Sequence, residues 1–167
     1  LESHTTWTTV NGLQPWTDYE FEIVALDAAG NASAAGLTVQ IQTTDETSPT
    51  WANDSVLLAS DPTDTGVTLG WTAAQDNVAV TTYRLYQDNV DIGAFDGATL
   101  STPVDSLQSG LTYLFRVEAE DAAGNLTFGG PSLSVDLSDT IAPAWPPNAE
   151  CLPTEITPTS VKLGWSA

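Results

Sequence analysis

The five-residue sequence Asp-Ala-Ala-Gly-Asn occurs twice in this chain, at Asp27–Asn31 and at Asp121–Asn125. The two copies lie 94 residues apart (121 − 27). Each copy follows a run in which apolar and polar residues alternate, as in a half-buried β-strand, and each precedes a second extended segment. We therefore predict that this five-residue sequence forms the turn of a β-hairpin, with Gly30 and Gly124 at the position that requires a positive φ angle.

The same offset of 94 residues relates positions throughout the chain. The matched pairs are Leu13 and Leu107, Tyr19 and Tyr113, Asp45 and Asp139, Pro49 and Pro143, Trp51 and Trp145, and Leu69-Gly70-Trp71 and Leu163-Gly164-Trp165. A fixed period that runs through strands and loops alike indicates tandem homologous domains. We expect a complete repeat at 46–138, the C-terminal part of an earlier repeat at 1–44 and the N-terminal part of a third repeat at 140–167.

Both partial repeats lack the equivalents of residues 74–94. Half a sandwich leaves a large apolar face and unpaired strand edges exposed. We therefore expect the sequence to be a window on a longer repetitive chain. The alternative is that strands of a neighbouring molecule complete the partial repeats.

The charge balance is strongly acidic, with 22 Asp and Glu residues against 3 Lys and Arg residues and a net charge of −19. Nucleic acids and anionic membranes need cationic surface, so the composition argues against both as partners. No apolar run is long enough for a membrane helix, and we expect no membrane insertion. A surface this acidic suits cation binding, or an extracellular, marine or salty setting.

The pattern of short alternating runs separated by Gly, Pro, Asn and Asp is typical of an all-β protein. In the complete repeat we predict strands near residues 56–60, 66–72, 81–87, 90–94, 100–104, 112–120 and 132–137. Seven strands are the number expected for an immunoglobulin-like β-sandwich. The predicted fold class is therefore all-β, with tandem seven-stranded sandwiches.

Four stretches of the complete repeat carry a family pattern: Val67-Thr-Leu-Gly-Trp71, Tyr83-Arg-Leu-Tyr86, Leu107 with Tyr113, and Ala119-Glu-Asp-Ala-Ala-Gly-Asn125. This pattern resembles the bacterial type of fibronectin type III domain, and with the partial repeats it covers the whole chain. The resemblance implies that Trp71 and Trp165 are core residues of the second strand. It also implies that Tyr19 and Tyr113 bind the loop before the sixth strand through their hydroxyls. The first repeat has the usual proline of this loop, Pro15, whereas Ser109-Gly110 replaces it in the second.

Residues suited to catalysis are scarce. His4 is the only histidine, which excludes histidine-based triads and multi-histidine metal sites. The single cysteine, Cys151, excludes an intramolecular disulfide, and its alignment with Leu57 predicts a buried free thiol rather than a reactive one. With 22 acidic residues, pairs of carboxylates arise by chance and do not indicate a glycosidase. We predict that this segment is not an enzyme.

The six tryptophans raise the possibility of carbohydrate binding, because aromatic faces stack on sugars. By the family pattern Trp71 and Trp165 belong to cores, and we expect Trp51 and Trp145 to pack where each linker meets a sandwich. Trp7 and Trp16 remain as candidate ligand-binding platforms. Ordinary packing is the alternative for both.

Residues with side-chain oxygens form the most promising candidate site, which is a site for a metal ion. In the predicted topology, the linker with Asp45, the loop with Asp76 and Asn77, and the hairpin with Asp121 and Asn125 meet at one end of the complete repeat. Ca²⁺ takes six to eight such oxygens, so these five residues, with Asp139 as the equivalent of Asp45 at the next joint, are candidate calcium ligands. The alternative is that Asp and Asn only cap turns through their own backbone.

The function that these features favour is a structural spacer in a large secreted or cell-surface protein of bacterial type. Such an array holds a catalytic, adhesive or anchoring module at a distance, and its linkers, which contain a proline, favour a stiff joint. Its partners are neighbouring repeats of the same or like chains, with polysaccharide or a cell surface as further candidates. Two alternatives remain: a subunit of an extracellular filament completed by neighbouring chains, and a carbohydrate-binding accessory module of a secreted hydrolase.

Overall fold

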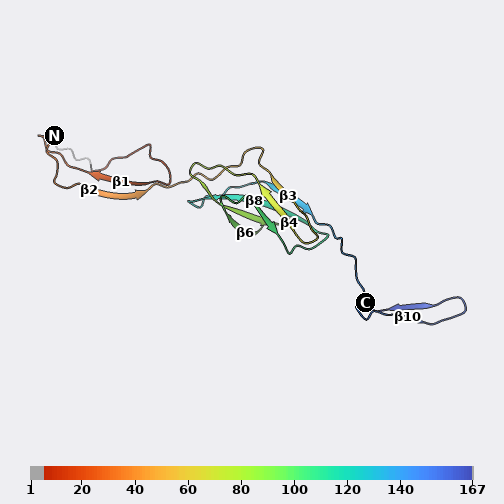
Figure 1. Ribbon diagram of the computed structural model, residues 1–167. Helices are drawn as coiled ribbons and strands as arrows, with labels where there is room; N and C mark the ends of the chain where they lie inside the picture. Colours follow the sequence, from red (N-terminus) through yellow and green to blue (C-terminus); the bar gives the residue numbers. More distant parts are fainter. Residues whose placement is uncertain (1–5, 167) are drawn as a thin grey trace.

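The structure is a computed structural model that describes residues 6–166. Figure 1 shows three segments that follow one another along the chain: a first hairpin, a central sandwich and a last hairpin. All regular structure in the described residues is β-strand. Consequently, no described segment is a helix of the length and apolarity needed to cross a membrane.

The central sandwich consists of two antiparallel sheets. The first has the strand order β3-β4-β7, formed by β3 (Leu57–Ser60), β4 (Val67–Trp71) and β7 (Ser101–Val104). The second has the order β6-β5-β8-β9, formed by β5 (Val80–Gln87), β6 (Val90–Asp96), β8 (Thr112–Asp121) and β9 (Ser132–Asp136). This arrangement of sheets is that of an immunoglobulin-like sandwich of the fibronectin type III kind, which confirms the predicted all-β sandwich fold.

The core lies between the two sheets, because inward-facing positions alternate with exposed ones along the strands. In β4 every second residue is buried, and Leu69 at its centre is fully enclosed. Phe115 and Val117 of β8 are equally inaccessible. Trp71 is 5% exposed and packs edge-on against Tyr83, with ring centroids 5.7 Å apart, so its predicted role as a core residue is confirmed.

Two tyrosines bind the loops before their strands in the same way. The backbone N–H of Gln14 donates to the Tyr19 hydroxyl at 2.8 Å, and the N–H of Gln108 donates to the Tyr113 hydroxyl at the same distance. The predicted role of both tyrosines is thus confirmed. The second loop has Ser109 where the first has Pro15, yet the hydrogen bond has the same length in both.

The two end segments are hairpins with exposed apolar faces. The first pairs β1 (Asp18–Ile23) with β2 (Leu37–Gln42), and the last pairs β10 (Cys151–Thr154) with β11 (Lys162–Trp165). Two predictions for the last hairpin are wrong in this structure: Cys151 is exposed rather than buried, and Trp165 is 66% exposed rather than part of a core. The reason is that no second sheet covers this hairpin within the described residues.

Candidate metal centre at the joint

The linker before the central sandwich is docked onto it rather than free. Asp45 is only 7% exposed, and its backbone carbonyl accepts a hydrogen bond from the Asn125 side chain at 3.0 Å. Pro49 is buried. Thr50 forms a β-bridge with Gln75, with N–H···O distances of 2.7 and 2.9 Å in the two directions. The linker therefore belongs structurally to the sandwich that follows it.

Trp51, at the end of this linker, is held by a buried polar network. Its indole N–H donates to the Thr127 hydroxyl at 3.2 Å, and this hydroxyl donates to the Glu118 carboxylate at 2.6 Å. Glu118 is 1% exposed and also accepts from Arg116 and from the backbone N–H groups of Gly129 and Gly130. The predicted packing of Trp51 at the start of the sandwich is confirmed, since its ring also contacts the core.

Three carboxylates converge beside the docked linker. One oxygen each of Asp45, Asp76 and Asp121 lies within 4.8 Å of the others. Asp121 is 3% exposed, Asp45 is buried and Asp76 is half-buried. At such separations, two unit charges repel by about 3–4 kcal/mol at an effective dielectric constant of about 20. The arrangement can therefore attract a cation.

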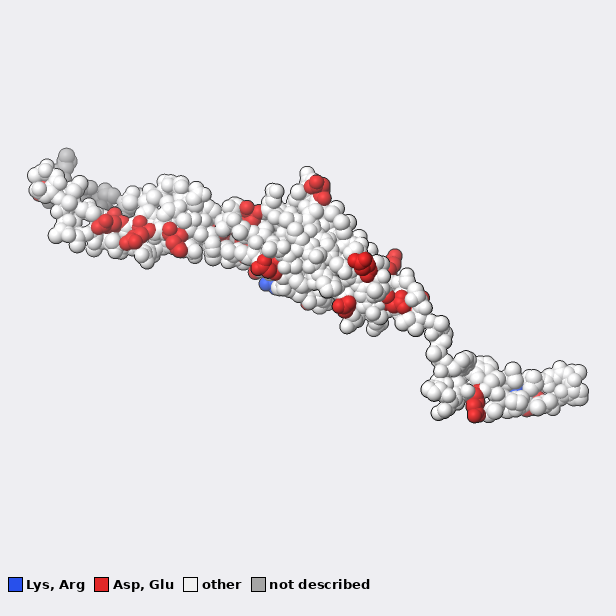
Figure 2. Space-filling view, viewed as in Figure 1, with Lys and Arg blue, Asp and Glu red and all other residues white. Residues whose placement is uncertain are grey.

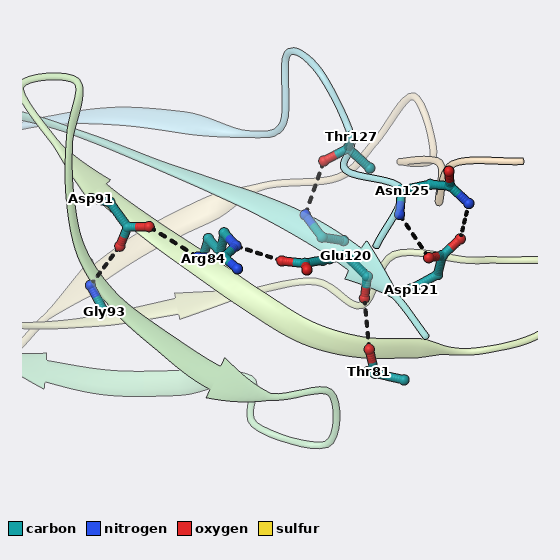
Figure 3. Close-up of polar contacts among 9 residues, drawn as sticks. Thr81, Arg84, Asp91, Gly93, Glu120, Asp121, Asn125 and Thr127 are labelled. Atoms are coloured by element: carbon teal, nitrogen blue, oxygen red, sulfur yellow. Dashed lines mark hydrogen bonds and ion pairs between the residues drawn. The ribbon is translucent and has the colours of Figure 1, made fainter. Parts of the chain in front are cut away.

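Asp121 is positioned by the turn that follows β8, and this turn has the conformation that its sequence predicts. Gly124 has φ = 87°, and Gly30 in the first copy has φ = 88°, as the turn requires. Figure 3 shows Asn125 beside Asp121. The backbone N–H and the side-chain amide of Asn125 donate to the two carboxylate oxygens of Asp121, at 2.8 and 2.7 Å respectively. Because the same amide also donates to the Asp45 carbonyl, Asn125 connects the hairpin to the linker.

The loop after β4 supplies the third acid. The Asn77 side chain donates to both oxygens of Asp45, at 3.1 and 3.3 Å. Oδ2 of Asp76 accepts from the backbone N–H groups of Val78 and Ala79, whereas Oδ1 is shielded from solvent and has no hydrogen-bond partner. The two oxygens of Asp76 thus have different roles: one caps the turn and the other has no partner.

Among the described residues, no Lys or Arg side chain neutralises this site. The chain has three Lys and Arg residues in all, and each forms its ion pairs elsewhere. Arg84 lies between Asp91 and Glu120 (Figure 3), where the hydrogen bond that it donates to Glu120 and the negative charge of Glu120 raise the pKa of the guanidinium. Arg116 pairs with Glu118, and Lys162 pairs with Glu155. Figure 2 shows the result at the surface, where carboxylates extend along all three segments with little basic surface between them.

The remaining predicted metal residue, Asp139, lies apart from the cluster. It is exposed, and its carboxylate caps the linker through the N–H of Ile141 at 3.1 Å, as Asp45 does through Thr47 at 3.0 Å. Counterparts of Asp76 and Asp121 at the same offset fall at 170 and 215 (76 + 94 and 121 + 94), beyond the 167 residues of the chain. Of the six predicted metal residues, the structure therefore brings together all except Asp139.

The predicted aromatic platforms do not form one surface. Trp7 is 78% exposed, whereas Trp16 is half-buried and has a positive φ of 46°. Sequence reasoning missed Phe128, which projects from the β8–β9 hairpin with 94% of its surface exposed beside a hollow that Trp51 also lines. It also missed buried Glu118. His4, the single histidine, lies outside the described residues.

No family model matches the chain. Among curated proteins, it is 38% identical over 135 residues to Chitinase A1 of Niallia circulans, covering 78% of this chain and 19% of that protein. It is 44% identical over 82 residues to Chitinase D of the same organism (49% and 15% covered) and 33% identical over 132 residues to Exoglucanase B of Cellulomonas fimi (76% and 12% covered). The chain therefore spans less than a fifth of the length of these relatives.

Similar solved structures include fibronectin type III domains. The FN1–FN3 domains of chicken CNTN1 match with a TM-score of 0.49 and 17% identity, over 76% of this chain and 45% of that one. The sixth fibronectin type III domain of human fibronectin type III domain containing protein 3 matches with a TM-score of 0.42 and 21% identity, over 55% and 89%.

Proposed function

We propose that this chain is a non-catalytic spacer, built from tandem fibronectin type III-like domains, within an extracellular polysaccharide-degrading protein. The observation that carries this proposal is the docked linker. Asp45 is buried, Asn125 binds its carbonyl, and Thr50 pairs with Gln75. A linker fixed to the following sandwich transmits orientation from one domain to the next, which a flexible tether does not.

The comparisons support an accessory role. Stretches of 135 and 132 residues of this chain match a chitinase and an exoglucanase, respectively. These two enzymes are named for different polysaccharides. We therefore infer that the stretch that each shares with this chain is not the part that selects its polysaccharide. Chitin and cellulose are too large to enter a cell, so enzymes that degrade them work outside it, and we place this chain there. The comparisons give no support to the filament alternative.

Carbohydrate binding is the second candidate function, and exposed aromatic rings favour it. Trp7 is 78% exposed and Phe128 is 94% exposed, and both can stack on a sugar face. Phe128 also lies beside polar groups of the hollow that Trp51 and Thr127 line. Such an accessory module brings its enzyme to the polymer, whereas a spacer only separates two modules.

Retention on insoluble chitin and cellulose distinguishes the two functions. For a spacer we expect the purified chain to remain in the supernatant with both polymers and to release no soluble sugar. Small-angle scattering of the same sample should show an elongated particle. Retention that disappears in Trp7→Ala, Trp16→Ala or Phe128→Ala would replace the spacer with the binding module, and a compact particle would contradict the spacer directly.

A further inference from the structure

We propose that Asp45, Asp76 and Asp121 form a Ca²⁺ site that joins the linker to two loops of the central sandwich. The three residues come from the linker, from the loop after β4 and from the hairpin between β8 and β9. An ion bound here contacts three separate segments at once. This inference does not depend on attachment to a polysaccharide-degrading enzyme, because it concerns only the residues of the joint.

The spacing of the acids suits calcium. Ca²⁺ binds oxygens at 2.3–2.6 Å, so two ligands of one ion lie at most about 5 Å apart. The three carboxylate oxygens fall within 4.8 Å of one another. Mg²⁺ binds at 2.0–2.1 Å, which limits its ligands to a spread of about 4 Å, and it requires near-ideal octahedral geometry. The 4.8 Å limit is compatible with both ions, but oxygens from three separate segments suit the variable geometry of calcium better than the strict octahedron of magnesium.

Enough oxygens are available for the six to eight that calcium takes. The three carboxylates supply three to six, depending on whether each binds through one oxygen or two. The side chains of Asn77 and Asn125 already lie against this cluster. Rotation of the Asn77 amide by half a turn replaces its NH₂ group with its oxygen, and water completes the shell. Asn125 positions the site, because its amide binds both Asp121 and the Asp45 carbonyl.

A second observation, independent of the acidic cluster, points to a ligand. Oδ1 of Asp76 is shielded from solvent and accepts no hydrogen bond, although Oδ2 of the same carboxylate accepts two. A buried carboxylate oxygen without a partner is unfavourable, and native structures normally satisfy such atoms through protein, water or an ion. Every Lys and Arg of the chain pairs elsewhere, so none of them compensates this charge, whereas a bound cation would do so.

The first hairpin and the second linker each show the same local capping without the cluster. In the first copy of the hairpin sequence, Asn31 binds Asp27 as Asn125 binds Asp121, yet both residues are exposed. At the second linker, Asp139 caps Ile141 and is also exposed. Turn capping therefore does not require burial of the acid. These two places also supply matched controls.

The test is titration calorimetry of the whole chain after treatment with a chelator, with CaCl₂ and MgCl₂ at constant ionic strength. We expect one calcium ion per chain with a dissociation constant of about 10⁻⁴–10⁻³ M, the range of extracellular modules. Magnesium should bind at least tenfold more weakly. Calcium at about 100 times the dissociation constant should raise the melting temperature, because it binds only the folded form.

Asp76→Asn is the decisive variant, since Asn keeps an oxygen for the N–H groups of Val78 and Ala79. It should weaken calcium binding at least tenfold, whereas Asp139→Asn and Asp27→Asn should leave the dissociation constant unchanged. If Asp76→Asn does not fold, Asp45→Asn replaces it. The proposal fails if calcium produces neither saturable binding up to about 10 mM nor a shift in melting temperature. It also fails if Asp139→Asn weakens binding as much as Asp76→Asn does.

Discussion

Trp71 shows how one residue fixes the sandwich. It lies at the end of β4, pairs with Leu57 of β3, and its ring contacts Tyr83 and Phe95 of the opposite sheet. The indole N–H is buried without a hydrogen-bond partner, so the residue acts through its apolar surface and shape. Packing, rather than hydrogen bonding, explains why a large aromatic stands here.

Replacing Trp71 with Ala should lower the free energy of unfolding by about 3–5 kcal/mol, because it leaves a cavity between the sheets. Trp71→Phe should cost clearly less, since it keeps a ring and removes the N–H that has no partner. Urea unfolding of the chain, followed by circular dichroism, measures both. Equal losses for the two variants would contradict the view that filling the space between the sheets is what Trp71 contributes.

The exposed Asp27 has a lowered pKa, chiefly because the Asn31 side chain donates to its carboxylate, and backbone N–H groups of the turn add to this effect. A lowered pKa in the folded state means that this turn is stabilised above the unfolded pKa of about 3.9 and loses that contribution as pH falls through the folded pKa. We predict that Asn31→Ala raises the pKa of Asp27, measured by NMR titration of the carboxyl carbon. Asn11→Ala, remote from the turn, should leave it unchanged.

At the scale of elements, the strands of the central sandwich could be predicted to within one or two residues. Alternating burial, as in β4 and most of β8, produces a period of two that the sequence displays directly. The meeting of Asp45, Asp76 and Asp121 was predictable for a related reason, because the topology places their three segments at one end of the sandwich.

Glu118 could not be predicted, because the end of β8 is buried on both faces. A glutamate between Val117 and Ala119 reads as an outward-facing residue, yet the linker and the β8–β9 hairpin cover it. The hairpin approaches so closely that a Cβ on Gly130 would lie 1.9 Å from the carbonyl oxygen of Val117 and 2.9 Å from Nε1 of Trp51. Such covering depends on tertiary contacts that leave no periodic signal in the sequence.

Thr127 links these elements, and its replacement tests the network. Its hydroxyl accepts from Trp51 and from the backbone N–H of Ala119, and donates to Glu118. Thr127→Val keeps the shape but leaves buried polar groups without partners, so we expect a loss of about 1–3 kcal/mol in the free energy of unfolding. Thr127→Ser retains the hydroxyl and should cost less. A Val variant as stable as the Ser variant, in the same urea experiment, would mean that packing alone holds Trp51.

At the scale of the whole molecule, the two linkers are similar in sequence but different in surroundings. The first is buried against the sandwich that follows it, through Asp45, Pro49 and Trp51. In the second, Thr140 binds Asp64 of the preceding sandwich, whereas residues 141–145 are exposed, and Trp145 is 68% exposed. The first linker meets two acidic loops, whose counterparts at the second joint would fall beyond the 167 residues.

Docking of the first linker onto the sandwich that follows it should fix the linker backbone, and ¹⁵N relaxation of the whole chain in millimolar calcium measures this. We expect order parameters of about 0.85 for the backbone amides of residues 45–51 other than Pro49, as in rigid structure, and below about 0.6 for those of residues 141–145 other than Pro143. Both stretches are measured in one sample, so the second serves as an internal control. Order parameters below about 0.6 in residues 45–51 would instead show that the first linker is a flexible tether and is not docked on the sandwich.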